Sequence, residues 1–265
     1  MKQAMGTAVL CFGLAATAAV PAQDMMRYID LSSPEMTSAE MTRGDVETAL
    51  DKASGGPPPD FTGKRLSGLD LSGLNLSGAI LRAARLNKTK LAGARLDRAV
   101  LDQAWLVEAD LTGASLKGAA LFASQMLRAH LDGADLSEAR VAADLTGASL
   151  VGASIANAHL GADMRNQSMG LMRAVLKSAN LERVNARGAD MSRVDLEFAS
   201  LKGADLTGAS LKGAELGGAD LTGVTVVDTD FDGADLGSAK LIAPIGLDKA
   251  KNFDKVKNRE RLIRK

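Results

Sequence analysis

The side chains that could support catalysis are few and lie far apart along the chain. His130 and His159 each precede a large apolar residue, but their positions in the repeat of the chain place them on different faces. They should therefore not share a metal ion or a proton relay. The single cysteine, Cys11, lies in an apolar N-terminal stretch, and the sequence contains no phosphate-binding loop. The cysteine is therefore a poor candidate for an activated nucleophile.

Acidic side chains are plentiful, with 32 Asp and Glu against 32 Lys and Arg. A pair such as Asp205 and Glu215 could act as general acid and base if a cleft removed it from water. The sequence predicts no such cleft, so these carboxylates are expected to titrate near their ordinary values. We predict that the protein is not an enzyme and uses no cofactor or metal. The balanced charge also makes nucleic acid an unlikely partner.

The dominant feature of the chain is an apolar residue at every fifth position from Phe61 to Leu241. Alanine usually stands two positions before it and glycine often two positions after it, as in the unit 109–113, which reads ADLTG. On a helix, each step of five would turn the side chain by about 140°. In a straight strand, an odd period would alternate the side chains between faces. The period is satisfied if the chain turns a corner in every unit, so that each leucine points to one axis and glycine eases the corner.

This A(D/N)LxG pattern resembles the pentapeptide-repeat family. Of 37 central positions, 28 are Leu and only Ala186 is not large and apolar, so chance does not explain the pattern. The resemblance implies an all-β solenoid, a right-handed quadrilateral β-helix with four units in each coil. With coils spaced like β-strands at about 4.8 Å, some nine coils would form a rod roughly 40–45 Å long.

Residues 1–22 have the layout of a secretory signal peptide. Lys2 precedes an uncharged apolar stretch that ends at Val20, and Ala22 completes a small-residue cleavage site. The mature chain would then begin near Gln23 and contain no cysteine, which suits an oxidising periplasm. The alternative is an uncleaved membrane anchor, because the apolar stretch lies at the short limit of a membrane span.

The two flanks of the repeat region are expected to cap the rod with short α-helices. Residues 23–60 contain a helix start at Thr42, with Asp45 three positions on, and a linker rich in Gly and Pro that leads into the β-helix of residues 61–245. Residues 246–265 are basic and are predicted to form a helix or tail, since Leu247, Phe253 and Val256 fall on one helical side. This segment could make weak contact with an anionic membrane surface.

The repeat is interrupted near residues 161–170. Steps of four residues occur between Val141 and Leu145 and between Leu160 and Met164, and a step of seven follows between Met164 and Leu171, so the shifts sum to zero. We interpret the segment as an excursion that restores the original phase, either as a structural accommodation or as a recognition loop. The residues of this candidate loop are Arg165, Asn166, Gln167, Ser168 and Met169.

Residues 20 positions apart should stack on the outside of the rod if four units form a coil. This stacking predicts an apolar patch on two adjoining faces of the early coils. Its members are Ile80, Val100, Trp105, Val107, Phe122 and Leu127. Such a patch is covered by the protein's own flank before Phe61, by a second copy or by a protein partner.

The sequence therefore predicts an exported, non-enzymatic repeat scaffold for protein–protein interaction. One alternative is a DNA-mimicking protein that binds topoisomerases, a function that the resemblance implies for some relatives. Another is a structural element of the envelope that uses the basic C-terminus. Export and outer faces of mixed charge argue against the DNA mimic.

Overall fold

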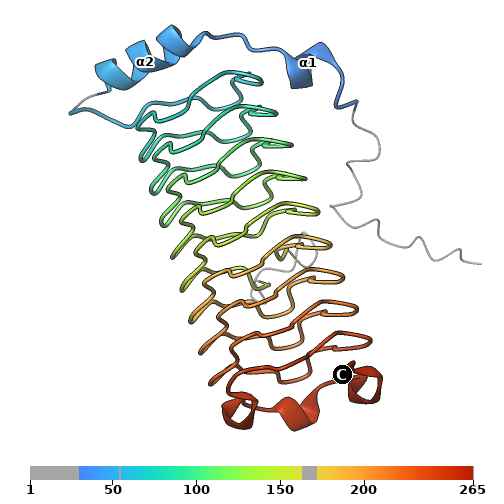
Figure 1. Ribbon diagram of the computed structural model, residues 1–265. Helices are drawn as coiled ribbons and strands as arrows, with labels where there is room; N and C mark the ends of the chain where they lie inside the picture. Colours follow the sequence, from blue (N-terminus) through green and yellow to red (C-terminus); the bar gives the residue numbers. More distant parts are fainter. Residues whose placement is uncertain (1–29, 54, 163–171, 265) are drawn as a thin grey trace, which may run out of the picture.

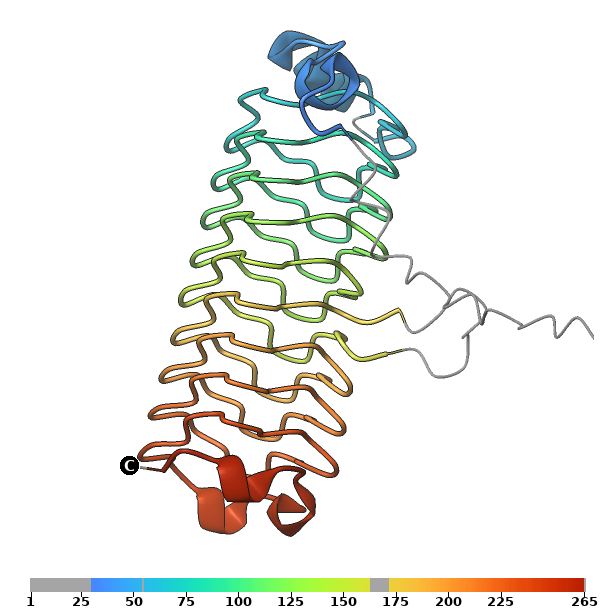
Figure 2. The ribbon, with the colours of Figure 1, turned by 90° about the vertical axis from the view of Figure 1, so that its right-hand side faces the viewer.

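The computed structural model describes residues 30–53, 55–162 and 172–264. Figure 1 shows a rod of stacked coils with helices α1 (Pro34–Thr37) and α2 (Arg43–Lys52) at one end. Three short 3₁₀ turns lie at the other end: η2 (Leu247–Lys249), η3 (Phe253–Lys255) and η4 (Arg259–Arg261). The same stack of coils is seen after a quarter turn in Figure 2.

Successive coils are joined by parallel bridges between residues 20 positions apart. Asp70 pairs with Lys90, Lys90 with Asp110, and Asp110 with His130, so this ladder is formed as predicted. Because each unit has five residues, four units complete a coil. We name the sides of the coil by their first inward residues: side 1 from Phe61, side 2 from Leu66, side 3 from Leu71 and side 4 from Leu76. The described residues thus form a four-sided solenoid of isolated bridges and turns.

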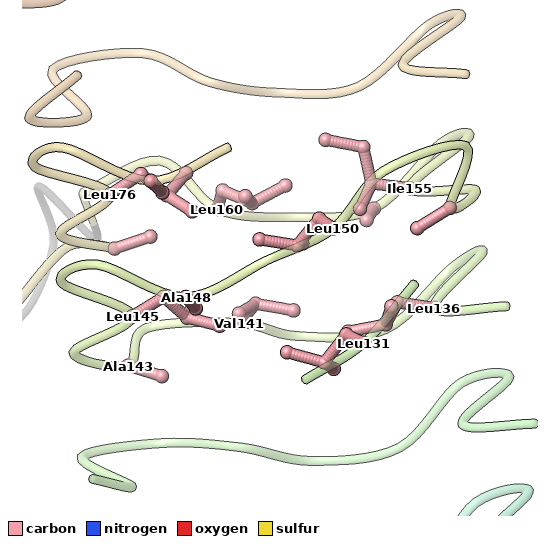
Figure 3. Close-up of a cluster of buried hydrophobic side chains, with 14 of the residues drawn as sticks. Leu131, Leu136, Val141, Ala143, Leu145, Ala148, Leu150, Ile155, Leu160 and Leu176 are labelled. Atoms are coloured by element: carbon pink, nitrogen blue, oxygen red, sulfur yellow. The ribbon is translucent and has the colours of Figure 1, made fainter. Parts of the chain in front are cut away.

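The core is a column of inward leucines surrounded by small alanines. Leu111 and Ala109 are both fully buried, and so is Ala186, the one small residue at a central position. Figure 3 shows side chains such as Leu131 and Leu150 pointing inward from neighbouring coils. The interior is a continuous apolar cluster, which confirms the predicted inside of the rod. Function must therefore reside on the outer surface and the ends.

The polar residue before each leucine has a local structural role. The carboxylate of Asp110 accepts a hydrogen bond from the amide of Thr112 at 3.0 Å, and Asp205 accepts one from Thr207 at 2.9 Å. Asp and Asn favour such contacts with the backbone two residues on, which hold the chain in a turn. The preference for Asp or Asn therefore reflects turn formation as well as pairing between coils.

The residue two positions after each leucine turns the corner with a positive φ. Gly113 has φ 63°, as expected, but the same conformation is adopted by Glu138 at 63° and Phe198 at 60°. The left-handed region costs a residue with a side chain roughly 1–2 kcal/mol relative to glycine. Glycine is thus preferred at the corner but not required, because the stacked coils hold the conformation.

The inward residues resume their five-residue phase after the interruption, as predicted, but the segment contributes fewer units to the coil than its spacing suggests. Asp144 pairs with Val175, which is 31 positions on instead of 20. Leu160 belongs to side 1 and Leu176 to side 2, so a single unit step separates them. Spacing alone could not show this, because a segment that leaves the coil can contain any number of residues. The predicted loop of residues 165–169 lies outside the described residues.

The N-terminal flank closes the first coil. Helix α2 begins after Thr42, whose side chain accepts a hydrogen bond from the amide of Asp45, while Asp45 accepts one from the amide of Thr42 at 2.8 Å. This is the reciprocal cap expected from the sequence. Val46 is fully buried against the core, and Ala39 forms an antiparallel bridge with Leu66. The flank therefore covers core leucines that an open end would expose.

The predicted C-terminal α-helix is wrong. The chain instead forms one more coil, because Ile245, Lys251, Lys257 and Ile263 all make parallel bridges to the coil above. These residues are six positions apart, so the last coil consists of wider units, each containing a 3₁₀ turn. Apolar residues three and six positions apart fit this coil and an α-helix equally well, which explains the error. Phe253 closes the core and packs edge-on against Phe231, with ring centres 5.4 Å apart.

Candidate interaction surfaces

The histidines and carboxylates do not assemble into a reactive centre on the described surface. His130 lies on side 3 between Asp110 and Ser149, whereas His159 lies on side 1. Both are exposed, and they are on different sides, as the unit count predicted. Residues 30–53, 55–162 and 172–264 contain no group of three His, Cys, Asp or Glu that could hold a metal ion.

Asp205 and Glu215 lie on opposite sides of the rod and do not form a pair. Glu215 accepts two hydrogen bonds of 2.9 Å from Arg173, and Asp205 accepts one of 2.9 Å from Arg187. Partial burial alone would raise the pKa of Asp205, but hydrogen bonds from Thr207 and Arg187 outweigh it and lower the pKa. The expectation of ordinary titration is therefore wrong for this aspartate. A carboxyl with a lowered pKa stays ionised at neutral pH and is a poor general acid.

Ion pairs between coils give the outer faces a mixed charge. The Lys177 ammonium lies 2.8 Å from Glu197 and 3.6 Å from Asp195, and the hydrogen bond to Glu197 raises the pKa of Lys177. Lys202 lies within 4 Å of both Glu182 and Asp220. Lysines and carboxylates therefore neutralise one another along the rod, and the sides do not form a surface of a single sign.

The predicted apolar patch divides between two sides of the solenoid. On side 1, Ile80 pairs with Val100, and Phe122 is 43% exposed. On side 2, Trp105 stacks between Arg85 and Gln125. The members that are half-buried are Ile80, Val100, Trp105 and Leu127. The patch is therefore less exposed than the sequence suggested, and Val107, which is only 5% exposed, is covered.

The cover over Val107 is the N-terminal flank. The side-chain amide of Asn87 donates a hydrogen bond of 3.0 Å to the carbonyl oxygen of Met36, and it accepts one of 3.0 Å from the amide of Val107. Asn87 thereby ties the flank to side 2. Val107 is the one member of the predicted patch that takes part in these hydrogen bonds, so the flank covers one edge of the patch. The sequence analysis identified neither Met36 nor Asn87, because their contact joins residues 51 positions apart.

A groove of about 410 Å³ remains between the flank and side 2. Its apolar walls come from Leu31, Met36 and Val107. One edge is charged, since Glu108 lies 2.6 Å from Arg128 and 3.6 Å from Lys88. We call this feature the side-2 groove.

Two buried polar atoms beside Trp105 lack hydrogen-bond partners in the described chain. They are Nε of Arg85 and Oε1 of Gln125, from the coils on either side of the tryptophan. An unsatisfied buried donor or acceptor costs about 1–3 kcal/mol, so the two atoms lower the stability of this part of side 2. Both atoms lie beneath the surface of side 2, so they offer no hydrogen-bonding group to a ligand on that side.

Comparison with known proteins gives consistent results. The family model described as pentapeptide repeats matches the chain in 8 copies, over residues 60–98, 94–121, 171–208 and 199–237. No curated protein sequence matches. One similar solved structure is HetL, a pentapeptide repeat protein involved in heterocyst differentiation regulation from the cyanobacterium Nostoc sp. strain PCC 7120. The two chains are 26% identical over 84% of this chain and 95% of HetL, with a TM-score of 0.43.

Two further solved structures are similar to the chain. QnrB1, a plasmid-mediated fluoroquinolone resistance protein, is 18% identical over 76% of this chain and 85% of its own, with a TM-score of 0.35. A pentapeptide repeat protein from the thylakoid lumen of Arabidopsis thaliana is 28% identical. That similarity covers 53% of this chain and 67% of the plant protein, with a TM-score of 0.21.

Proposed function

The chain belongs to the pentapeptide-repeat family, and we propose that it is an exported, non-enzymatic scaffold that binds a protein partner at the side-2 groove. The observation that carries this proposal is the apolar groove at Val107 on side 2, the side that also bears Trp105, on a rod whose interior is filled. Tryptophan and arginine are enriched among the residues that dominate binding energy at protein interfaces. Trp105 and Leu127 would supply the apolar contact, with Arg85 beside them.

The chemistry of the groove favours a peptide segment as its occupant. Leu31 and Val107 offer apolar contact, and Glu108 and Arg128 offer charge at the rim. An apolar groove with charged side chains at its rim suits this class of ligand better than a small polar metabolite.

Export rests on the first 22 residues, which lie outside the described residues. Lys2, the apolar stretch to Val20 and the small residue Ala22 support a cleaved signal. No helix among the described residues has the length and apolar character needed to cross a membrane. The predicted mature chain has no cysteine, which fits an oxidising compartment such as the bacterial periplasm.

The charge pattern supports a protein scaffold over a mimic of DNA. A mimic needs a continuous negative surface, whereas the pairs made by Lys177 and Lys202 neutralise carboxylates along this rod. We also infer that the coil has the right hand that the family resemblance implied. An experimental structure of the protein would test the hand directly.

Site-specific photo-crosslinking in cells tests the proposed binding surface. A photoreactive amino acid at Leu127, on side 2, should give a discrete covalent adduct with a partner protein. The same amino acid at Lys117, an exposed residue on the opposite side 4, is the matched control and should not. Replacing Trp105 by Ser should remove the Leu127 adduct without lowering the cellular level of the protein. Equal adducts at both positions, or an adduct insensitive to the Trp105 change, would contradict the proposal.

A further inference from the structure

The two ends of the rod carry opposite charge. The N-terminal flank, residues 30–53, has six acidic and two basic side chains and a net charge of −4. The last coil, residues 246–264, has three acidic and seven basic side chains and a net charge of +4. Figure 1 shows these segments at opposite ends of the rod. The molecule is therefore polar along its axis, although its formal net charge is zero.

The basic end repeats its cations through the six-residue units of the last coil. The last residues of η2, η3 and η4 are Lys249, Lys255 and Arg261, and all three are exposed. Lys255 lies 3.7 Å from Asp232 of the coil above. Other cations of this end have no described carboxylate within 4 Å; they are Lys249, Lys257, Arg259, Arg261 and Arg264. Arg259 and Arg264 lie over the Phe253 ring, with distances of 5.2 and 5.8 Å to its centre. Lys249, Lys257 and Arg261 are thus left for a ligand.

The same coil also exposes apolar surface. Ile245 is 58% exposed and Ile263 is 41% exposed, which places them among the few large apolar side chains left in solvent. Both occupy outward positions on adjoining sides of the last coil, where they give a partner apolar area to contact beside the cations. The basic end therefore suits a partner that offers both apolar contact and negative charge.

The acidic end has a hollow that meets both requirements. It measures about 500 Å³ and lies between α2 and the linker that leads into the first coil. Leu50, Leu74 and Pro58 provide apolar lining, and the hollow also carries the carboxylates of Asp51 and of Glu47, which pairs with Arg43 at 2.7 Å. A lysine or arginine side chain could lay its aliphatic stem on the apolar wall and place its charged head at a carboxylate.

We propose that the C-terminal end of one copy docks on the N-terminal end of a second copy, head to tail. Opposite net charges of 4 on the two ends favour this pairing and disfavour contact between like ends. Each dimer leaves one free end of each kind, so the contact adds further copies and forms rows of rods. The proposal is independent of partner binding at the side-2 groove.

The size of the contact sets its strength. The end of a single narrow coil buries less than the roughly 1,200 Å² of a standard interface. Attraction between exposed charges is also screened beyond about 10 Å at 0.1 M salt. Association should therefore be weak, reversible and strongly dependent on salt.

Sedimentation velocity on residues 23–265, which contain the whole described rod, tests the proposal. At about 20 mM salt the weight-average mass should rise with protein concentration, and at about 500 mM it should fall to that of a monomer. A monomer at every concentration up to about 100 µM in low salt would overturn the proposal, because two oppositely charged ends would then have failed to bind under the most favourable conditions.

Charge reversal identifies the surfaces involved. Glu47→Lys with Asp51→Lys raises the net charge of the N-terminal end from −4 to 0 and so removes its attraction for the basic end, and lysine at position 51, in the last turn of α2, is compatible with the helix dipole. Lys249→Glu with Lys257→Glu and Arg261→Glu makes both ends acidic. Each variant alone should remain monomeric, whereas an equimolar mixture should associate at low salt. Circular dichroism of each variant checks that the fold is retained.

A mid-rod variant is the matched control for total charge. Its three reversals change the net charge by the same amount as those at the basic end; they are Arg98→Glu, Lys117→Glu and Arg140→Glu. This control should associate like the wild type. If folded end variants do not associate when mixed, or if the control loses association equally, the head-to-tail contact is wrong. Association that persists in both end variants would place the contact elsewhere on the rod and would equally overturn the proposal.

Discussion

Replacing Leu111 by Ala tests the inside of the rod in quantitative terms. Leu111 is fully buried on side 3, between Leu91 and Leu131 of the adjacent coils. The substitution removes three carbons, which at about 0.8 kcal/mol each costs about 2.4 kcal/mol of transfer free energy. Backbone hydrogen bonds fix the spacing between coils. The amide of Leu91 donates to the carbonyl oxygen of Asp110 at 2.6 Å, and the amide of Leu111 donates to the carbonyl oxygen of His130 at 2.7 Å. The space cannot collapse freely, so we expect a total loss of about 3–4 kcal/mol.

Unfolding in urea measures this loss. The titration is monitored by far-ultraviolet circular dichroism and by Trp105 fluorescence, and the circular dichroism spectrum of the folded protein should be dominated by β structure. The two probes are needed because a repeat protein can unfold in more than one step. Thr112→Ala, at the exposed neighbour of Leu111, is the control and should cost under about 0.5 kcal/mol. Equal losses at the two positions would refute the assignment of inside and outside.

The remaining predictions concern the last coil, the corners and the turn aspartates. Phe253→Ala removes the edge-on contact with Phe231 and should lower the free energy of unfolding by about 3–5 kcal/mol; a loss below about 1 kcal/mol would mean that the last coil does not close the core. Glu138→Gly should raise stability by about 1 kcal/mol in urea titrations, because Glu138 has φ 63°, and a destabilised variant would count against strain at the corners. The pKa of Asp205 is lowered despite partial burial. Its contribution to the free energy of unfolding is therefore fully present above the pKa of aspartate in the unfolded chain, about 3.9, and is lost as the pH falls through the pKa in the folded protein. The urea midpoint should therefore drop at acid pH, and less so in Thr207→Val, whereas identical acid profiles would argue against a role for this hydrogen bond.

The five-residue units could be predicted because every unit satisfies the same local requirements. An inward leucine, a small alanine and a corner residue recur whatever the distant contacts are, so periodicity alone defines the side of each residue. The last coil follows the same logic with a different period. Residues 245–250, 251–256 and 257–262 read IGLDKA, KNFDKV and KNRERL. A search for a period of six would have identified these units, whereas a search for helical faces did not.

The groove was harder to predict because it depends on a contact without periodicity. Asn87 occupies an outward position of an ordinary unit, and only its bonds to Met36 and Val107 show that it anchors the flank. The course of the flank over side 2 is a tertiary feature that hydrophobic spacing does not encode. The number of units in the interruption was predicted wrongly for a related reason. The chain leaves the repeat between Leu160 and Leu176, so the spacing of apolar residues there no longer shows on which side of the coil a residue lies.

The location of the mature protein tests the proposed function most directly. Intact-mass analysis of the protein recovered from the periplasmic fraction should give a chain that begins at or near Gln23. Removal of residues 1–22 would place the scaffold outside the cytosol and away from topoisomerases. A cytosolic protein that retains Met1 would contradict the proposal of an exported scaffold.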